Sequence, residues 1–367
     1  MDEGRLISDV EGLSGLISLD GTSVKEIGRV SAVYPFRVPR FYGSLMERGN
    51  PSCPIRLQAV PTAAELGRRG VTDPLGESLI SVTPSFFTRY PGRGVFLVTA
   101  ECAMYCRFCN RRRLVGRGFR PETSREETLA YLEQCDGIRE VIVSGGDPLM
   151  LQPAELEYVL GRLRKIERIG VVRVSTRVPV VFPEGLERHR QAIKRHGPLW
   201  FIIHINHPRE VTPEFTGAVR ALREAGAVII SQTVLLRRVN DCRHILARLF
   251  EKLVELGVKP YYLFQLDDVL GATHFKVRLE TGIAIMRSLR KSVSGLCIPH
   301  YALDITGGLG KIPLENGCIR GRKGQRVFME NLYGEKGTYR DDGEESRCND
   351  CRICRICQGG TEVVRFQ

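Results

Sequence analysis

Three cysteines in one short loop are the residues of this chain best suited to chemistry. Cys102, Cys106 and Cys109 form a C-x3-C-x2-C pattern in the run Cys-Ala-Met-Tyr-Cys-Arg-Phe-Cys. Three thiolates at this spacing suit a soft metal centre, and a cubane iron-sulfur cluster bound by three cysteines leaves one iron free for a non-protein ligand. A structural zinc site, which usually takes four ligands, and loop thiols without metal are the alternatives. The spacing and the residues that fill it favour the cluster, whose open iron is a place where a reaction can begin.

A lysine that follows a glycine-rich loop is the second candidate. The run Asp-Ile-Thr-Gly-Gly-Leu-Gly-Lys-Ile-Pro ends with Lys311, Ile312 and Pro313. A lysine amine held in this way can form a Schiff base with an aldehyde cofactor such as pyridoxal 5'-phosphate (PLP). The spacing G-x-G-K is also typical of part of a phosphate-binding loop, although it is not a Walker motif, because Ile312 stands where Ser or Thr is required. Spacing alone leaves both interpretations open.

The cysteine motif, continued through Asn-Arg-Arg-Arg to Arg113, resembles the radical S-adenosylmethionine (SAM) enzymes and in particular the lysine 2,3-aminomutase family. The resemblance is close to continuous from Arg89 to about Lys311. It includes the segments Ser144–Asp147, His204–Pro208, Gln232–Cys242, Tyr261–Phe275 and Asp304–Pro313.

The resemblance implies sites for three cofactors and an amino acid. Cys102, Cys106 and Cys109 would bind a 4Fe-4S cluster. The residues implied for SAM are Ser144, Gly145, Gly146, Asp147, His204 and Gln232. Lys311 would be the catalytic lysine that forms the Schiff base with PLP, whose phosphate and ring would be held by Arg89, Tyr90 and Arg93. Substrate-binding residues would be Arg111, for the α-carboxylate, and the pair Asp267 and Asp304, for the distal ammonium of lysine.

The pair of aspartates carries the expected substrate class. Two neighbouring acids in a dry pocket repel each other unless a cation lies between them, so the pocket should favour a basic amino acid over glutamate. Asp268 departs from the commonest family pattern and adds a negative charge nearby, which leaves arginine open beside lysine.

The implied activity is that of an isomerase, a radical SAM and PLP-dependent 2,3-aminomutase that moves the α-amino group of a basic L-amino acid, lysine first, to the β-carbon. It would need a reducing electron donor of the flavodoxin or ferredoxin type. The alternatives are an arginine 2,3-aminomutase and an enzyme that supplies β-lysine for modification of elongation factor P. A radical SAM RNA-modifying protein would share the cysteine loop but needs neither Lys311 nor the paired aspartates. A purely structural iron-sulfur or zinc protein would leave the other motifs unexplained.

A run of four cysteines near the end of the chain predicts a further metal site. Zinc is favoured over a second cluster at this spacing. The resembled family places a zinc site here that is shared with a neighbouring subunit, at the position of Cys242, which implies a homo-oligomer. This chain differs in the number and spacing of its tail cysteines, Cys348, Cys351, Cys354 and Cys357.

Apolar strand-like runs that alternate with helical patterns must position these residues. The pattern predicts an α/β fold with a parallel sheet that forms an open or partial (β/α)6 barrel, with chemistry at the carboxyl ends of the strands. The resemblance implies a partial (β/α)6 barrel of the radical SAM type. We expect a mostly helical extension over 1–88, the barrel over 89–300, and the PLP-lysine segment with a metal-binding tail over 301–367. The predicted strands are 94–99, 141–144, 171–176, 199–204, 227–232 and 260–265.

Local signals place three helices between these strands. Ser124 to Glu127 is typical of a capping box, Pro153 predicts the start of a helix, and Thr212 followed by Pro predicts an N-cap. The Pro153 helix should bury one face made of Leu156, Val159, Leu160 and Leu163.

Composition limits the setting and the partners. The 367-residue chain has a formal charge of +12, but its basic residues are dispersed, so we expect a small-molecule substrate rather than nucleic acid. Its 12 cysteines cluster as metal ligands do in a reducing compartment. The sequence begins without a signal-like segment and contains no stretch of about 20 apolar residues, so we expect a cytoplasmic protein without a membrane span.

Overall fold

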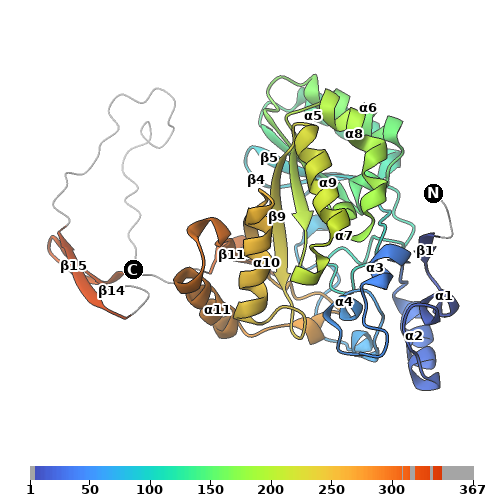
Figure 1. The fold of residues 1–367 in the computed structure, drawn as a ribbon. Coiled ribbons are helices and arrows are strands. Elements are labelled where there is room, and N and C mark those ends of the chain that lie inside the picture. Colours follow the sequence, from blue (N-terminus) through green and yellow to red (C-terminus); the bar gives the residue numbers. More distant parts are fainter. Residues whose placement is uncertain (1–4, 308, 315–318, 331–333, 341–367) are drawn as a thin grey trace. The chain divides into compact units, whose positions relative to one another are not determined.

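The computed structural model describes residues 5–307, 309–314, 319–330 and 334–340 (Figure 1). The chain divides into two compact units, Met1–Glu315 and Asn316–Gln367. All the predicted site residues up to Lys311 belong to the first unit.

A sheet of ten strands forms the centre of the first unit, in the linear order β12-β11-β10-β9-β8-β7-β6-β5-β4-β3. Neighbouring strands from β5 to β11 pair in parallel, whereas β3, β4 and β12 pair antiparallel at the two edges. The predicted α/β class with a mostly parallel sheet is therefore confirmed. The strands are β3 (Ser81–Thr83), β4 (Phe86–Tyr90), β5 (Arg93–Thr99), β6 (Glu140–Gly145), β7 (Val171–Thr176), β8 (Trp200–His204), β9 (Val228–Leu235), β10 (Lys259–Gln265), β11 (His300–Ile305) and β12 (Gly310–Pro313).

The parallel run is one strand longer than the six predicted strands. β11 follows the helix α11 (Leu279–Ser292) and pairs in parallel with β10, with Tyr301 opposite Leu263. Its run His-Tyr-Ala-Leu-Asp-Ile mixes polar and apolar residues, which is why periodicity did not reveal it. This strand carries Asp304, and β12 turns back beside it with Lys311 opposite Asp304.

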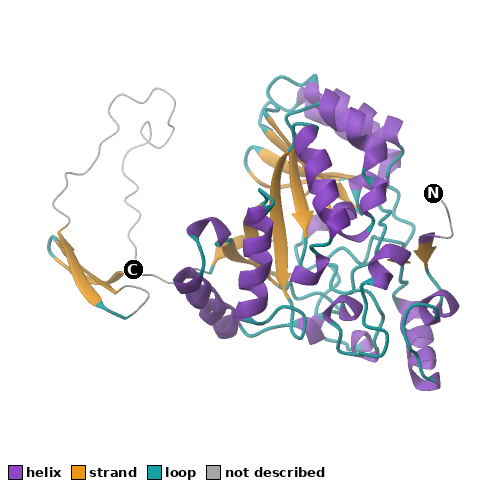
Figure 2. Ribbon diagram, viewed as in Figure 1, coloured by secondary structure: helices purple, strands orange, loops and turns teal. Residues whose placement is uncertain are grey.

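Helices connect the parallel strands and lie along the outside of the sheet (Figure 2). They bury one apolar face each, as α6 does through the four residues predicted for it. Thr212 caps α9 as predicted, because its hydroxyl accepts a hydrogen bond from the backbone N–H of Phe215 at 3.1 Å. The longer helices are α5 (Arg125–Gln134), α6 (Pro153–Arg164), α9 (Pro213–Glu224), α10 (Arg243–Glu255) and α11, and the shorter ones are α7 (Val178–Val181) and α8 (Arg190–Arg195).

The capping box predicted at Ser124 is wrong. A 3-10 turn, Pro121–Ser124, runs directly into α5, and Ser124 makes no side-chain cap. Its hydroxyl donates instead to the carbonyl of Pro121 at 3.2 Å. The preceding turn already has helical backbone geometry, so Ser124 does not adopt the extended conformation of an N-cap.

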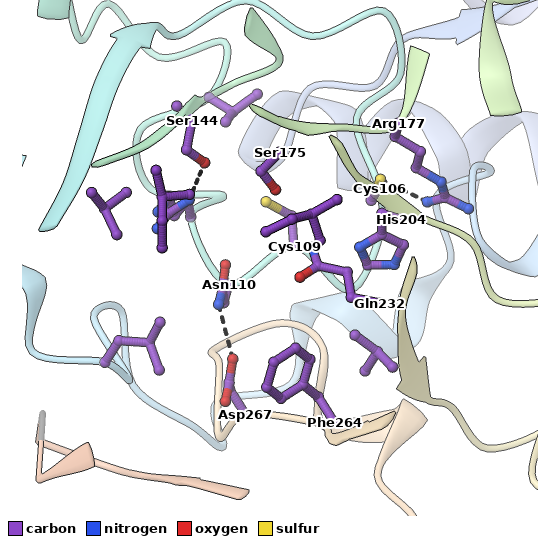
Figure 3. Close-up of a pocket in the computed structure, with 18 of the residues that line it drawn as sticks. Cys106, Cys109, Asn110, Ser144, Ser175, Arg177, His204, Gln232, Phe264 and Asp267 are labelled. Atoms are coloured by element: carbon purple, nitrogen blue, oxygen red, sulfur yellow. Dashed lines mark hydrogen bonds between the residues drawn. The ribbon is translucent and has the colours of Figure 1, made fainter. Parts of the chain in front are cut away.

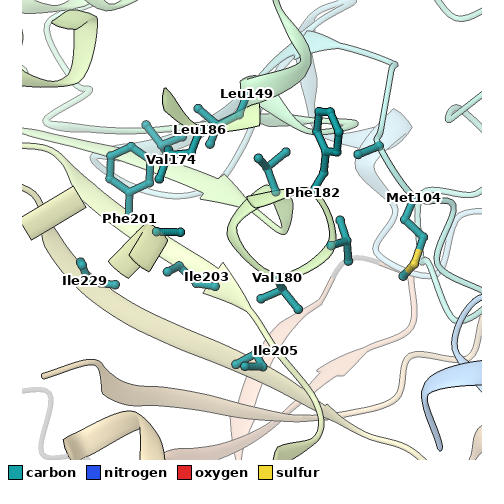
Figure 4. Close-up of a cluster of buried hydrophobic side chains, with 14 of the residues drawn as sticks. Met104, Leu149, Val174, Val180, Phe182, Leu186, Phe201, Ile203, Ile205 and Ile229 are labelled. Carbon is teal, nitrogen blue, oxygen red and sulfur yellow. The ribbon is translucent and has the colours of Figure 1, made fainter. Parts of the chain in front are cut away.

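Apolar side chains from the strands and from the connecting segments form one large core (Figure 4). Val174 of β7, Ile203 of β8 and Ile229 of β9 pack in it with residues of the loop and helix segment that follows β7. The core also includes Met104 of the cysteine loop. The loop that carries the three cysteines is therefore fixed to the body of the sheet.

Residues 5–88 contain both short helices and strands. The helices are α1 (Val10–Ser14), α2 (Gly21–Val33), α3 (Arg40–Ser44) and α4 (Pro54–Leu57), and β1 (Leu6–Ile7) pairs with β2 (Val38–Pro39). Tyr42 and Phe86 are fully buried in the main core. This part of the chain thus packs with the sheet and can supply side chains to the site.

The second unit contains a three-stranded antiparallel sheet made of β13 (Ile319–Lys323), β14 (Arg326–Glu330) and β15 (Lys336–Arg340). The cysteines of the predicted tail metal site, Cys348, Cys351, Cys354 and Cys357, lie outside the described residues. Among the helices that the structure describes, none has the length and apolar composition that crossing a bilayer requires.

Candidate active site

A cavity of about 390 Å³ lies at the carboxyl ends of the parallel strands. The residues that the sequence implied for the cluster, SAM, PLP and the substrate all line it, although they come from segments more than 200 residues apart. They are Arg89, Tyr90, Arg93, Cys102, Cys106, Cys109, Arg111, Ser144, Gly145, Gly146, Asp147, His204, Gln232, Asp267, Asp304 and Lys311. Cys242 does not line the cavity and stands apart from this set.

The three cysteines of the loop after β5 line the cavity and fit an iron-sulfur cluster. Burial raises the pKa of Cys102, and it raises the pKa of Cys109 to about 11, with the neighbouring cysteines adding to both shifts. These groups would remain neutral thiols unless a metal displaced their protons. In the part of the chain that the structure describes, no three Cys, His, Asp or Glu side chains converge closely enough to hold a single metal ion. A cubane cluster suits this arrangement better than zinc does, because each cysteine binds a different iron.

A buried ionic network holds the cysteine loop to the first part of the chain. Glu65 is fully buried and accepts hydrogen bonds from Arg107 and Arg112, both at 2.6 Å. Arg107 also donates to the carbonyls of Tyr34 and Pro35. Two guanidinium groups of the loop therefore share the single negative charge of Glu65.

Replacing Glu65 with Gln should destabilise the protein by about 3 kcal/mol or more, because two buried cations would lose their counter-charge. Urea unfolding followed by circular dichroism measures the change. Glu126→Gln is the matched control, since Glu126 pairs with Arg162 but its side chain is 64% exposed, and it should change the unfolding free energy by less than about 1 kcal/mol. Equal losses in the two variants would contradict the role given to Glu65.

The glycine turn after β6 packs against the start of the cysteine loop. A Cβ on Gly145 would lie 2.2 Å from the carbonyl oxygen of Thr99, and one on Gly146 would lie 2.2 Å from that of Glu101. No other residue fits at either position. The N–H groups of Gly146 and Asp147 donate to the carbonyls of Thr99 and Glu101 at 2.6 and 2.7 Å. The two glycines therefore line the cavity without side chains and fix the start of the cysteine loop against β6.

Asp147, which completes this turn, uses its carboxylate within the protein. Its oxygens accept hydrogen bonds from the Thr176 hydroxyl at 2.7 Å and from the backbone N–H groups of Leu149, Arg177 and Val178. Because these four donors occupy the carboxylate, Asp147 links the turn after β6 to the segment at the end of β7.

His204 and Gln232 stand side by side, opposite each other in the register of β8 and β9 (Figure 3). The His204 ring stacks on Phe108 with the centroids 5.4 Å apart. Burial lowers the pKa of His204 to about 3, so the imidazole is neutral. Its Nε2 atom is buried and has no hydrogen-bond partner among the described residues. A buried orphan nitrogen in a cavity wall suits a polar group of a ligand.

Lys311 also lines the cavity, and Tyr90 fixes its backbone. The Tyr90 hydroxyl accepts a hydrogen bond from the Lys311 N–H at 2.7 Å, and Arg93 stacks over the Tyr90 ring at 4.2 Å. The Lys311 amine pairs with Asp304 at 3.1 Å and lies 5.1 Å from the centroid of the Phe264 ring. The amine therefore has one carboxylate partner and an aromatic wall, with basic residues close by that suit a phosphate.

Asp267 completes the acidic pair. Its carboxylate accepts a hydrogen bond from the Asn110 amide at 2.9 Å. Burial raises the pKa of Asp267 to about 6; the Asn110 hydrogen bond opposes this shift and the negative charge of Asp304 adds to it. The expectation that Asp268 adds charge to the pocket is wrong, because Asp268 pairs with Lys276 at 2.5 Å and does not line the cavity.

Arg111 also lines the cavity and is held by two hydrogen bonds. Its Nε atom donates to Glu77 at 2.8 Å and its Nη1 atom donates to the Ser144 hydroxyl at 3.1 Å. Glu77 is buried and also pairs with Arg113 at 2.9 Å. The guanidinium of Arg111 is thus held in a fixed orientation in the cavity wall.

Sequence reasoning missed several residues that hold this site together. Arg177, the residue after β7, was not among the predicted site residues, yet its guanidinium lies 2.8 Å from the sulfur of Cys106 (Figure 3). Asn110 stands inside the cysteine motif, but nothing in the motif points to Asp267. Glu65 and Glu77 come from the first part of the chain, which carries no recognisable motif. The only sequence feature that points to Glu65 and Glu77 is the excess of arginines in the cysteine loop, because buried arginines require acidic partners.

Comparison with known proteins gives consistent matches along the chain. Residues 96–250 match the model of the Radical SAM superfamily. The chain is 36% identical over 365 residues to the L-lysine 2,3-aminomutase of Clostridium subterminale, covering 97% of this chain and 86% of that protein. It is 39% identical over 321 residues to a putative L-lysine 2,3-aminomutase of Aquifex aeolicus, covering 85% and 86%. A glutamate 2,3-aminomutase of Clostridioides difficile is 35% identical over 312 residues, covering 84% of this chain and 74% of that protein. Relatives named for two different amino acids are thus about equally similar, so the substrate has to be argued from the pocket.

Proposed function

Because this chain belongs to the lysine 2,3-aminomutase family of radical SAM enzymes, we propose that its substrate is L-lysine, whose α-amino group it moves to the β-carbon. The protein is an isomerase, and its family implies a 4Fe-4S cluster, SAM and PLP as cofactors. The observation that carries the choice of lysine is the pair of partly buried carboxylates, Asp267 and Asp304, beside the amine of Lys311.

The cavity offers suitable residues for each cofactor. Cys102, Cys106 and Cys109 would hold the cluster, and the glycine turn with His204 and Gln232 would face SAM. Lys311 would hold PLP through its amine, with the phosphate near Arg89 and Arg93. Bound together, these groups supply a radical that removes and returns one hydrogen atom and a conjugated ring that stabilises the migrating nitrogen.

The protein's own contribution is to bind and orient the amino acid and to exclude water. Arg111, held by Glu77, presents a planar guanidinium that suits a carboxylate. Asp304 and Asp267 line the cavity beside Lys311, and their carboxylates suit the distal ammonium of the substrate. A carboxylate in place of that ammonium would meet two acids, which argues against glutamate.

Lysine is favoured over arginine by the position of Asp268. This third acid would have given the pocket a further negative charge, but its side chain is paired with Lys276 outside the cavity. Two carboxylates remain for the distal group, and one of them already pairs with a primary amine, that of Lys311, at 3.1 Å. A primary ammonium is therefore the kind of group that one of these carboxylates already binds in this structure.

A direct assay tests this proposal. Anaerobically reconstituted protein is incubated with SAM, PLP, dithionite and lysine, arginine or glutamate in separate reactions, and β-isomers are resolved by chromatography with mass detection. We expect β-lysine, with the other two amino acids converted at least about tenfold less efficiently. β-Arginine as the main product would replace lysine as the substrate, and no β-isomer from any of the three would contradict the proposed function.

Lysine binding should weaken in acid because Asp267 has a pKa of about 6 in the empty site. The ammonium of lysine binds the carboxylate form, so KM should be constant well above this pH and should rise by up to about tenfold per pH unit below it. Measuring KM between about pH 5 and pH 8 tests this dependence.

Two variants make the pH test specific. Asp267→Asn should give a high KM that no longer changes across this range, because the titrating group is gone. Asp268→Asn is the control and should leave the wild-type curve unchanged, since Asp268 lies outside the cavity. A wild-type curve for Asp267→Asn would exclude Asp267 as the titrating residue.

We also propose that the tail cysteines bind zinc, with Cys242 of a neighbouring subunit as a further ligand in a homo-oligomer. The spacing of the tail cysteines and the exclusion of Cys242 from the cavity support this assignment. Metal analysis of the reconstituted protein tests it, because iron well above four atoms per chain with no zinc would indicate a second cluster.

A further inference from the structure

Arg177 is a buried guanidinium that reaches one cysteine of the cluster loop. It follows β7 directly, and its side chain is 8% exposed. Its Nη1 atom lies 2.8 Å from the sulfur of Cys106, a short contact for a nitrogen donor and a sulfur acceptor. Figure 3 shows the two side chains pointing at each other across the cavity wall.

The other side of the guanidinium is fixed by buried partners. The Nη2 atom donates to Glu210 at 2.8 Å and to the Gln58 side-chain oxygen at 2.7 Å. The guanidinium also lies over the ring of Phe108, with its central carbon 5.3 Å from the ring centroid. These contacts set the direction of Nη1, so that Arg177 has little freedom to turn away from Cys106.

Neutralising Glu210 does not account for this arrangement. Glu210 already accepts hydrogen bonds from the Tyr42 hydroxyl and from the backbone N–H groups of Asn206 and His207, at 2.7, 2.7 and 2.9 Å. Arg177 uses only Nη2 on Glu210, whereas Nη1 is directed at the sulfur. The Nη1 group of Arg177 therefore makes a contact that the ion pair with Glu210 does not require.

From this geometry we infer that Arg177 donates a hydrogen bond to the Cys106 thiolate when the cluster is bound and thereby raises the reduction potential of the cluster. The inference rests on the cluster that the proposed function requires, and it makes Arg177 a positioning residue. One-electron reduction by a low-potential donor adds one negative charge to the cluster. A positive group with an N–H directed at a cluster ligand stabilises that charge, since hydrogen bonds to the sulfurs are one of the means by which proteins set these potentials.

Substitution of Arg177 tests the inference through the potential rather than through turnover. Arg177→Gln removes the charge, and Arg177→Lys keeps it but loses the planar fork. Each anaerobically reconstituted protein is titrated with dithionite in the presence of redox mediators, without SAM or lysine, and the reduced cluster is quantified by electron paramagnetic resonance. At a fixed potential we expect the ratio of reduced to oxidised cluster in Arg177→Gln to fall about tenfold, which corresponds to a midpoint lower by 59 mV for a one-electron couple. Arg177→Lys should lie between Gln and the wild type.

Arg188→Gln is the matched control. Arg188 is a partly buried arginine that donates to the carbonyl of Leu149 at 2.7 Å and does not line the cavity. Its replacement should leave the midpoint unchanged. Equal midpoints for the wild type and both Arg177 variants would overturn the inference, while β-lysine formation by the wild type would still support the proposed function.

A second measurement on the wild-type protein covers the case in which the variants do not assemble a cluster. Protein grown with arginine labelled with 15N in the guanidinium group is reduced, and electron spin echo modulation is recorded at the cluster signal. We expect a 15N coupling from a guanidinium nitrogen within hydrogen-bond distance of a cluster sulfur. Absence of any such coupling would overturn the inference without the help of a variant.

Discussion

Lys311→Ala should abolish the absorption band of protein-bound PLP and leave the iron-sulfur spectrum unchanged. The amine is the atom that would hold PLP, and its partner is Asp304 on β11, outside the cysteine loop. Isomerisation should fall at least roughly 10³-fold, because groups that act as one unit lose most of the rate when one of them is removed. The PLP band is read after gel filtration, which removes cofactor that is not held by the protein.

Lys276→Ala is the control for this variant. Lys276 is an exposed lysine whose amine pairs with Asp268 outside the cavity, so its loss should change neither spectrum. A PLP band that persists in Lys311→Ala at wild-type intensity would show that another amine holds the cofactor. Loss of both spectra would show that Lys311 is needed for the fold of the site and would leave its chemical role unsupported.

Two short motifs explain why the sequence was informative about the chemistry. The cysteine motif and the segment from Asp304 to Lys311 are short local patterns whose residue types are dictated by what they bind. The strand before the cysteine motif was predictable because a buried parallel strand has a nearly continuous apolar run. The rule that the carboxyl ends of parallel strands share one edge then brought the cysteine motif together with His204, Gln232 and Asp267.

Other features depend on tertiary contacts that no local pattern contains. Glu77 is recognisable as a site residue only after the fold brings it to Arg111, and Glu65 only after it meets Arg107. The strand β11 was missed because its neighbours, β10 and β12, supply much of what makes it a strand. Ser124 has the right residue type for a cap, but the turn before it continues the helix.

The arginines of the site show how charge in the sequence can be misread. The run Arg111-Arg112-Arg113 is the densest basic segment of the chain, and its guanidinium groups form ion pairs with acidic side chains inside the protein. Arg112 pairs with Glu65, and Arg113 pairs with Asp73 and Glu77. Arg111 also pairs with Glu77, at 2.8 Å, so the formal charge of +12 says little about the surface near the cavity.

Cys109→Ala should have the opposite spectral effect to Lys311→Ala. A cubane held by three cysteines has no spare protein ligand, so removing one should leave the protein with little bound iron and no cluster signal. Cleavage of SAM under dithionite should fall at least roughly 10³-fold, since the electron has no route to it. The PLP band should remain, because Cys109 does not contact Lys311 or the residues that hold it in place.

Cys135→Ala separates the loss of a ligand from the loss of any thiol. Cys135 is a half-buried cysteine at the end of α5 and does not line the cavity, so iron content and SAM cleavage should match the wild type. Cys109→Ala that kept a full cluster and cleaved SAM at the wild-type rate would remove the basis for the site. The two variants in the cavity, each losing one cofactor and keeping the other, would show that one pocket holds two independent cofactor sites that work on the same amino acid.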